Sequence, residues 1–167
     1  MDNESNKLGP VCRFHRWKPA AVLRIGGEDA FTFLQGQFTN DLRQLDTAGA
    51  VYGLWLNHKG RVLADSFVCR GDDGGFWVVS YFCPATRIAE RLEAFVISDD
   101  VTIDDVTTSW EGITLFGSSV PDAVTGLGKG SFSFVGRRTN QPHHDILFPS
   151  GMVVSPAVPG GGRIPAT

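Results

Sequence analysis

The chain has 167 residues, a net charge of −3 and a sequence pI of about 5.7. An acidic balance excludes long-range attraction to nucleic acid or to an anionic membrane, and no apolar run is long enough to span a bilayer. The polar start of the chain is not a secretory signal, and Cys12, Cys69 and Cys83 form no CxxC pair. We therefore expect a soluble, cytoplasmic protein with reduced thiols.

One folded domain is expected between two irregular ends. Residues 1–18 form an N-terminal lead without a clear hydrophobic period, and residues 156–167 form a flexible tail rich in Pro and Gly. The domain between them covers residues 19–155, and its pattern is clearest before about residue 118.

In chain order, a strand over Ala20–Ile25 is followed by a short helix that Asp29 caps and Gly36 ends. A capped polar corner and a β-hairpin come next, then the clearest amphipathic helix, which begins after Pro84. The predicted hairpin strands are Val51–Asn57 and Arg61–Cys69, and the other predicted elements are strands at Phe76–Phe82, Val101–Ile103, Ile113–Phe116, Ser131–Val135, Ile146–Phe148 and Met152–Val154 and a helix at Pro121–Leu127.

Strands outnumber helices, and turn signals join neighbouring strands. This pattern predicts an α+β fold, a ferredoxin-like variant with a largely antiparallel sheet and helices packed on one face.

The hairpin allows a register prediction. A three-residue turn His58-Lys59-Gly60, with Gly60 left-handed, would place Asn57 opposite Arg61, Trp55 opposite Leu63 and Gly53 opposite Asp65. Side chains alternate between the two faces of a strand. One face would then be core, with Tyr52, Leu54, Leu56, Val62 and Ala64, and the other would carry Val51, Gly53, Trp55, Asn57, Arg61, Leu63 and Asp65.

Two interpretations account for the second face. A Trp beside Asn, Arg and Asp, with a Gly that leaves space, suits a flat heteroaromatic ligand held by stacking and a few hydrogen bonds. The other interpretation is a solvated sheet face on which Arg61 and Asp65 form a weak surface pair.

Other polar motifs predict no site. His143 and His144 are consecutive, so on an extended segment their imidazoles point to opposite faces and do not share a metal ion. The glycine-rich run 126–131 lacks the spacing of a phosphate-binding loop. Cys69 and Cys83 lie on or beside apolar strands and are expected to be core thiols.

The run FLQGQFTNDL at 33–42, followed by LWLNHKGRVLAD at 54–65, resembles the YgfZ family, folate-binding relatives of the glycine cleavage T-protein (aminomethyltransferase). The similarity covers about residues 20–117, the N-terminal part of those proteins. It implies a tetrahydrofolate-type ligand and, in the YgfZ branch, a role in the assembly or repair of iron–sulfur proteins. The ligand site that we infer on this basis comprises Tyr52, Trp55, Asn57, Lys59, Arg61 and Asp65, braced by Thr39, Asn40 and Asp41.

Two departures from the family pattern bear on activity. T-proteins carry an Asp-Asp pair where this chain has Ala64-Asp65, and a downstream Cys motif of the YgfZ family is absent from these residues. We therefore expect a non-enzymatic folate-binding protein that assists iron–sulfur protein clients. The alternatives are a folate-dependent aminomethyltransferase-like enzyme and a shortened scaffold that binds no folate and acts by self-association.

Overall fold

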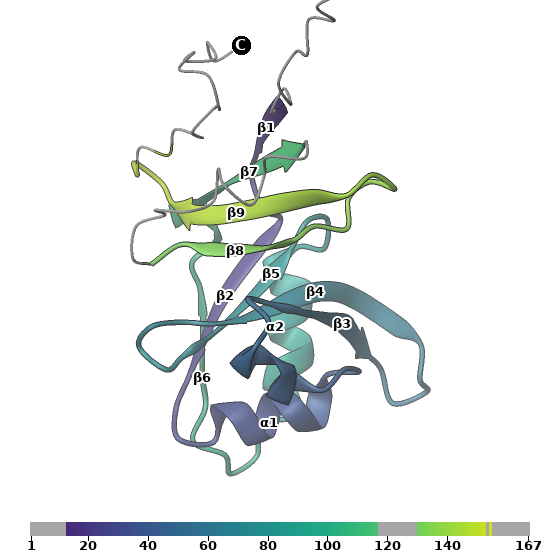
Figure 1. Ribbon diagram of the computed structural model, residues 1–167. Helices are drawn as coiled ribbons and strands as arrows, with labels where there is room; N and C mark the ends of the chain where they lie inside the picture. Colours follow the sequence, from purple (N-terminus) through teal and green to yellow (C-terminus); the bar gives the residue numbers. More distant parts are fainter. Residues whose placement is uncertain (1–12, 117–129, 153, 155–167) are drawn as a thin grey trace, which may run out of the picture.

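The computed structural model describes residues 13–116, 130–152 and 154 and contains two antiparallel β-sheets (Figure 1). The larger sheet has the strand order β3-β4-β5-β2-β6, and the smaller one has the order β1-β7-β9-β8. The strands are β1 (Arg13–Trp17), β2 (Ala21–Gly26), β3 (Val51–Leu56), β4 (Val62–Arg70), β5 (Phe76–Ser80), β6 (Thr102–Asp105), β7 (Trp110–Phe116), β8 (Phe132–Val135) and β9 (His143–Pro149).

Four helical segments connect these strands. They are the α-helices α1 (Ala30–Gln37) and α2 (Ala85–Glu93) and the 3₁₀ turns η1 (Leu42–Asp46) and η2 (Thr107–Ser109). In the described part of the chain, no helix has the length and apolar character needed to cross a membrane.

The helices cover one face of the five-stranded sheet, because each presents an apolar stripe to it. Leu34 of α1 and Ile88 of α2 belong to the same core as Leu23, Trp55 and Val78 of the strands. The α+β class, the antiparallel pairing and the helices on one face are all confirmed.

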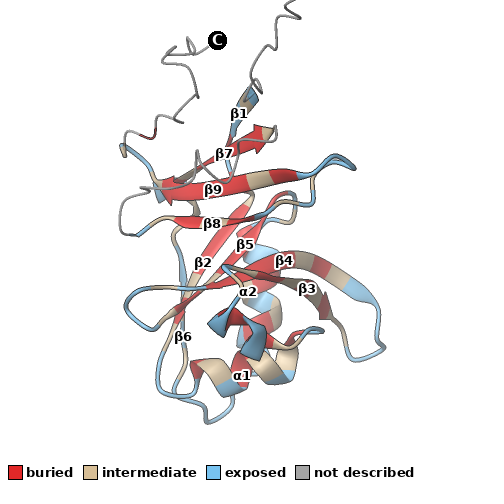
Figure 2. Cartoon of the chain, in the orientation of Figure 1, coloured by how far each residue is buried: buried red, intermediate tan, exposed pale blue. Residues whose placement is uncertain are grey.

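The opposite face of the same sheet packs on the four-stranded sheet. Phe67 and Val79 from the larger sheet share a second core with Trp110, Phe134 and Leu147 from the smaller one. The inner strands of the five-stranded sheet are thus covered on both faces, whereas its edge strand β6 (TIDD) is mostly exposed (Figure 2). This explains why the inner strands are rich in apolar residues.

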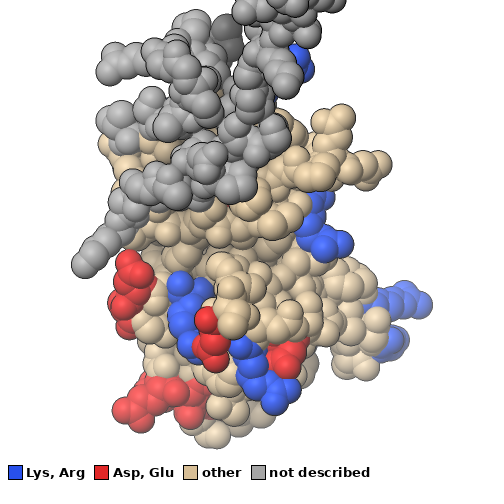
Figure 3. All heavy atoms as spheres, viewed as in Figure 1, with Lys and Arg blue, Asp and Glu red and all other residues tan. Residues whose placement is uncertain are grey.

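Charged side chains of both signs are interspersed on the face shown in Figure 3, over the helices and the larger sheet. No surface of a single sign is visible there, as expected for a chain with a net charge of only −3.

The hairpin register differs from the prediction at one residue. Asn57 N donates to Arg61 O at 2.9 Å and Gly60 has φ 73°, as predicted, and Leu56 pairs with Val62. A β-bulge then leaves Leu63 without a partner, so Trp55 pairs with Ala64. The predicted opposition of Trp55 to Leu63 and of Gly53 to Asp65 is therefore wrong.

The predicted assignment of hairpin faces is also wrong. Val51, Gly53 and Trp55 are buried toward the helices, whereas Tyr52 and Leu54 lie on the face of the second sheet together with Asp65 and remain partly exposed. Trp55 is fully buried, and its indole Nε1 donates to Ser66 Oγ at 2.9 Å.

Smaller differences concern the two ends and α1. Strand β1 forms within the segment assigned to the N-terminal lead, where it pairs with β7. Gly36 lies inside α1, and the carboxylate of Asp29 accepts from Asp100 N at 2.8 Å instead of capping the helix.

The helix predicted at Pro121–Leu127 and the tail 156–167 lie outside the described residues. Of the strand predicted at Met152–Val154, Met152 and Val154 are not in a strand, and position 153 is outside the described residues.

We expect Trp55→Phe to lower the free energy of unfolding by about 2 kcal/mol, because it leaves a cavity and removes the partner of the buried Ser66 hydroxyl. Denaturant unfolding measures this change. The matched control is Val62→Ala on the same hairpin, where the side chain is 57% exposed; it should change stability by less than about 0.5 kcal/mol. Equal, small effects of the two substitutions would contradict the buried position of Trp55.

Candidate functional site

The corner between α1 and β3 is fixed by polar side chains that bond backbone groups. Thr39 Oγ1 accepts from Leu54 N at 2.8 Å, and Asn40 Nδ2 donates to Tyr52 O at 3.0 Å. Asp41 caps η1 by accepting from Arg43 N at 3.0 Å. Hydrogen bonds from the Arg43 side chain also hold the pKa of Asp41 below its ordinary value. The corner is therefore braced by Thr39, Asn40 and Asp41, as predicted.

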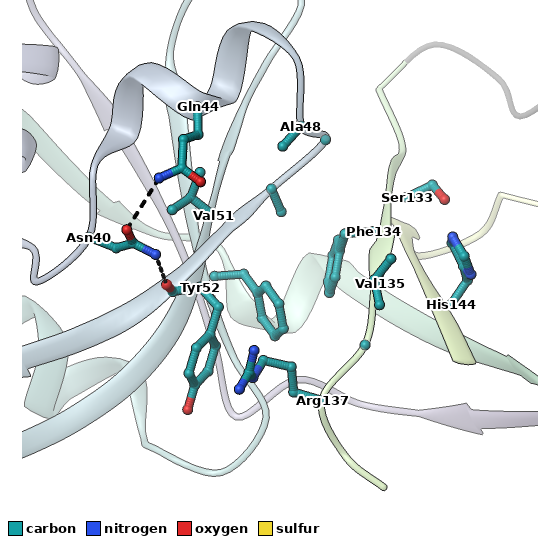
Figure 4. A pocket seen from close by; sticks show the side chains of 14 residues that line it. Asn40, Gln44, Ala48, Val51, Tyr52, Ser133, Phe134, Val135, Arg137 and His144 are labelled. Atoms are coloured by element: carbon teal, nitrogen blue, oxygen red, sulfur yellow. Dashed lines mark hydrogen bonds between the residues drawn. The ribbon is translucent and has the colours of Figure 1, made fainter. Parts of the chain in front are cut away.

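A pocket of about 600 Å³ opens beside this corner, between the beginning of β3 and the end of β8 (Figure 4). Asn40 and Gln44 lie at one end of it, and Tyr52 and Arg137 lie next to one another at the other. Its lining is Asn40, Gln44, Ala48, Gly49, Ala50, Val51, Tyr52, Phe67, Ser133, Phe134, Val135, Gly136, Arg137 and His144.

The lining combines aromatic surface with amides and one guanidinium. Tyr52 and Phe67 are in contact at 5.1 Å between ring centroids, and Phe67 packs against Phe134 in a tilted arrangement at 4.5 Å. Among the described residues of the lining there is no carboxylate. The pocket therefore favours a planar ligand that carries negative charge.

Tyr52 links the pocket to Asp65. Its hydroxyl donates to Asp65 Oδ2 at 2.9 Å, and the guanidinium of Arg137 lies 4.5 Å from the centre of its ring. Burial raises the pKa of Tyr52, and the hydrogen bond to Asp65 adds to the rise. Arg137 is exposed and forms no ion pair with any described residue, so its charge is available to a ligand.

A buried polar network holds the segment that carries Arg137. Asp145 is fully buried on β9 and accepts hydrogen bonds from the hydroxyls of Tyr81 and Thr114. Arg137 N in turn donates to the Tyr81 hydroxyl at 3.4 Å. Burial, followed by the bond to Asp145, raises the pKa of Tyr81 far above its ordinary value.

The structure brings only part of the predicted site together. Asn40 and Tyr52 line the pocket, and Asp65 lies behind Tyr52. Trp55 has no exposed surface on which a ligand could stack. Asn57 Oδ1 accepts from Lys59 N and Arg61 N and so stabilises the hairpin turn. Lys59 and Arg61 are exposed at the tip, on the order of 15 Å along the strand from Tyr52.

Sequence reasoning missed Arg137, Phe67, Phe134 and Gln44. From the sequence, Phe67 is expected to be a core residue of its strand, and it does belong to the core between the two sheets. Arg137 lies in a short polar connection about 85 positions from Tyr52, and no local pattern relates the two. Only the packing of the two sheets brings these residues to one pocket.

The histidines and cysteines considered in the sequence make local structural contacts. His143 is buried beside Asp145, with 3.9 Å between Nε2 and Oδ2, whereas His144 lines the pocket, so the two imidazoles do point apart. In the part of the chain that the structure describes, no cluster of three or more His, Cys, Asp or Glu could hold a metal ion. Cys69 is fully buried and Cys83 partly so, and burial raises the pKa of both thiols. The run 126–129 lies outside the described residues.

Residues 19–139 match the family described as GCVT N-terminal domain. The chain belongs to this family. The predicted resemblance to the T-protein and its YgfZ-like relatives is thereby confirmed, and with it the N-terminal position of the match.

A solved structure has the same fold as this chain. The glycine cleavage system aminomethyltransferase T from Bartonella henselae aligns with a TM-score of 0.67 at 17% identity, over 83% of this chain and 42% of that protein. At this identity the likeness establishes the fold alone.

Curated relatives of this GCVT domain include proteins with iron–sulfur names. An iron–sulfur cluster assembly factor IBA57 homolog, mitochondrial, from Cryptococcus neoformans is 31% identical over 60% of this chain and 26% of its own length. The one from Mycosarcoma maydis is 28% identical over 62% and 30%. An uncharacterised protein of Aquifex aeolicus is 27% identical over 64% of this chain and 72% of its own length. The chain thus spans less than a third of the length of each of these two IBA57 homologues.

The two tyrosines of the protein both donate to carboxylates, so the native protein should form tyrosinate only above the ordinary pKa of about 10. Because both pKa values are raised on folding, their contribution to stability is complete below pH 10 and is lost as the pH rises further. Ultraviolet absorbance titration of native and urea-unfolded protein measures the difference. Tyr81→Phe should halve the amplitude of the unfolded protein and leave the native transition of Tyr52 in place. A native transition near pH 10 with full amplitude would contradict both hydrogen bonds.

Proposed function

We propose that this protein binds a tetrahydrofolate-type ligand without transforming it, and that it assists the assembly or repair of iron–sulfur proteins. The observation that carries the first part is the pocket between β3 and β8, which Asn40 lines at one end and Tyr52 and Arg137 line at the other. A reduced folate offers a pterin ring with amide-like edges, an aromatic linker and carboxylates. Each of these groups has a partner of matching chemistry in the lining.

The aromatic and amide parts of the pocket suit the ring system. The exposed portions of Tyr52 and of the neighbouring phenylalanines provide flat surface for a heteroaromatic ring. Asn40 donates to Tyr52 O and accepts from Asp41 N and Gln44 Nε2. The remaining amide N–H groups of Asn40 and Gln44 and the Gln44 amide oxygen complement the donors and acceptors on a pterin edge. A volume of about 600 Å³ is in the usual range for sites of drug-sized ligands.

The guanidinium of Arg137 suits the carboxylates of the ligand. It has no ion-pair partner among the described residues, and no carboxylate in the described lining opposes an anion. Charge-assisted hydrogen bonds from arginine to a carboxylate are strong and directional. We therefore place the glutamate end of the ligand beside Arg137.

The second part of the proposal rests on the relatives. Two fungal proteins named as iron–sulfur cluster assembly factors share this domain with the chain. The chain spans less than a third of either one, so its share in that process is part of the proposal. Cytoplasmic location is the setting that we propose from the reduced thiols.

Calorimetric titration with tetrahydrofolate and 5-formyltetrahydrofolate tests the ligand. We expect saturable binding, and Arg137→Gln should weaken it about tenfold, which corresponds to about 1.4 kcal/mol for the lost charged contact. The matched control is Arg61→Gln at the hairpin tip, which should leave the affinity unchanged because Arg61 is remote from the pocket. Binding that depends on Arg61 and not on Arg137 would instead place the ligand at the tip. No saturable heat would overturn the proposal for this chain.

Deletion of the gene in the source organism tests the cellular role. We expect the activity of iron–sulfur enzymes to fall and the wild-type chain to restore it, whereas Arg137→Gln should restore it only in part. Enzymes without a cluster serve as the control and should keep their activity. Unchanged activity of the iron–sulfur enzymes would overturn this part of the proposal.

A further inference from the structure

A second pocket, of about 350 Å³, lies at the other end of β8 from the first one. It opens between the turn that joins β4 to β5 and the beginnings of β7 and β8. Its lining residues are Arg70, Gly71, Asp72, Asp73, Trp77, Trp110, Gly130, Ser131, Phe132 and Pro149. None of them lines the first pocket.

Three aromatic side chains form one wall of this second pocket. The ring centroids of Trp77 and Trp110 are 4.8 Å apart, and Phe132 lies 5.6 Å from Trp77 and stacks on Trp110 at 5.7 Å. Each ring is held by the other two, because Trp110 and Phe132 are buried in the core between the sheets. The wall is therefore rigid and offers π-electron surface to the pocket.

Gly71 brings the turn close to this wall. A Cβ at this position would lie 2.6 Å from Trp77 Nε1, so any side chain would displace the indole. The indole N–H of Trp77 has no acceptor among the described residues. The aromatic wall thus lies directly against the acidic turn.

Among the described residues, one negative charge at the mouth of the pocket has no partner. Arg70 is neutralised by Asp46 at 2.8 Å, and Asp73 by Arg24 at 2.6 Å. The carboxylate of Asp72 is exposed, and no described residue donates to it or forms an ion pair with it. The described lining therefore carries the charge of Asp72.

We propose that this pocket binds an organic cation, an alkylated ammonium or a guanidinium group, between the aromatic wall of Trp77, Trp110 and Phe132 and the carboxylate of Asp72. Aromatic faces attract such cations through the quadrupole of the ring, most strongly with tryptophan. An adjacent carboxylate adds Coulomb attraction. The volume of about 350 Å³ accommodates a head group of this kind and a short apolar stem.

Two probes of matched size test whether binding depends on the charge of the ligand or only on its shape. Choline and 3,3-dimethyl-1-butanol have nearly the same size, but only choline is charged. We expect choline to bind about fivefold more tightly than the alcohol because only the cation gains from the π faces and Asp72. The readout is the indole N–H signals of the four tryptophans in ¹⁵N-labelled full-length protein.

The tryptophan signals contain an internal control. The signal of Trp77, assigned with Trp77→Phe, should shift on saturation, whereas that of Trp55 should stay, because its N–H is bonded to Ser66 in the other core. Asp72→Asn should raise the dissociation constant of choline about fivefold and leave that of the alcohol unchanged. Asp99→Asn, which removes an exposed carboxylate outside the pocket, should change neither.

The origin of the cation is distinguished by a third probe, the peptide Gly-Arg-Gly with blocked ends. Tighter binding of the peptide than of choline identifies the side chain of a polypeptide as the ligand, and the reverse order identifies a free ammonium compound. Equal binding of choline and the alcohol, or no saturable shift by any probe at about 100 mM, overturns the proposal. Asp72→Asn should leave the folate titration unchanged, so the two proposals succeed or fail separately.

Discussion

The contact of Phe38 with Gly53 determines how the rest of the hairpin is oriented. The ring of Phe38 occupies the space where a Cβ on Gly53 would stand, with only 2.6 Å between the two positions, and it packs on Trp55 at 4.8 Å between centroids. Gly53 and Trp55 must therefore face the helices. Side chains alternate along a strand, so Tyr52 is directed to the opposite face, toward the second sheet and the pocket.

The elements of the fold follow from local patterns, but the identity of the buried face does not. The period of α2, the turn at Gly60 and the capping residues of the corner all act over a few positions, and the sequence displays them directly. The predicted register makes one face of the hairpin core and leaves the other open to a ligand or to solvent. Because both faces are covered, apolar residues occur on each and composition does not distinguish them.

The bulge at Leu63 has a similar origin. A single extra residue in β4 moves Asp65 from the predicted side of Trp55 to the side of Tyr52, where the hydroxyl and the carboxylate meet. No turn signal marks it, and it is defined only by the pairing of two strands. Strand β1 was missed because it depends on β7, almost a hundred residues later in the chain. The same holds for the pocket, which requires Tyr52 and Arg137 from different sheets.

The pocket and the buried network are parts of one arrangement. Asp145 is a fully buried carboxylate, and a group of this kind is tolerated only where donors compensate for the lost water. Tyr81, directly after β5 of the other sheet, and Thr114 on the neighbouring strand β7 supply these donors. Because the Tyr81 hydroxyl also accepts from Arg137 N, the bonds that compensate Asp145 fix the backbone from which Arg137 extends over Tyr52. The geometry of Arg137, the ligand contact that we propose, thus depends on a polar group in the core. Under the proposed function, the intersheet network would support ligand recognition as well as stability.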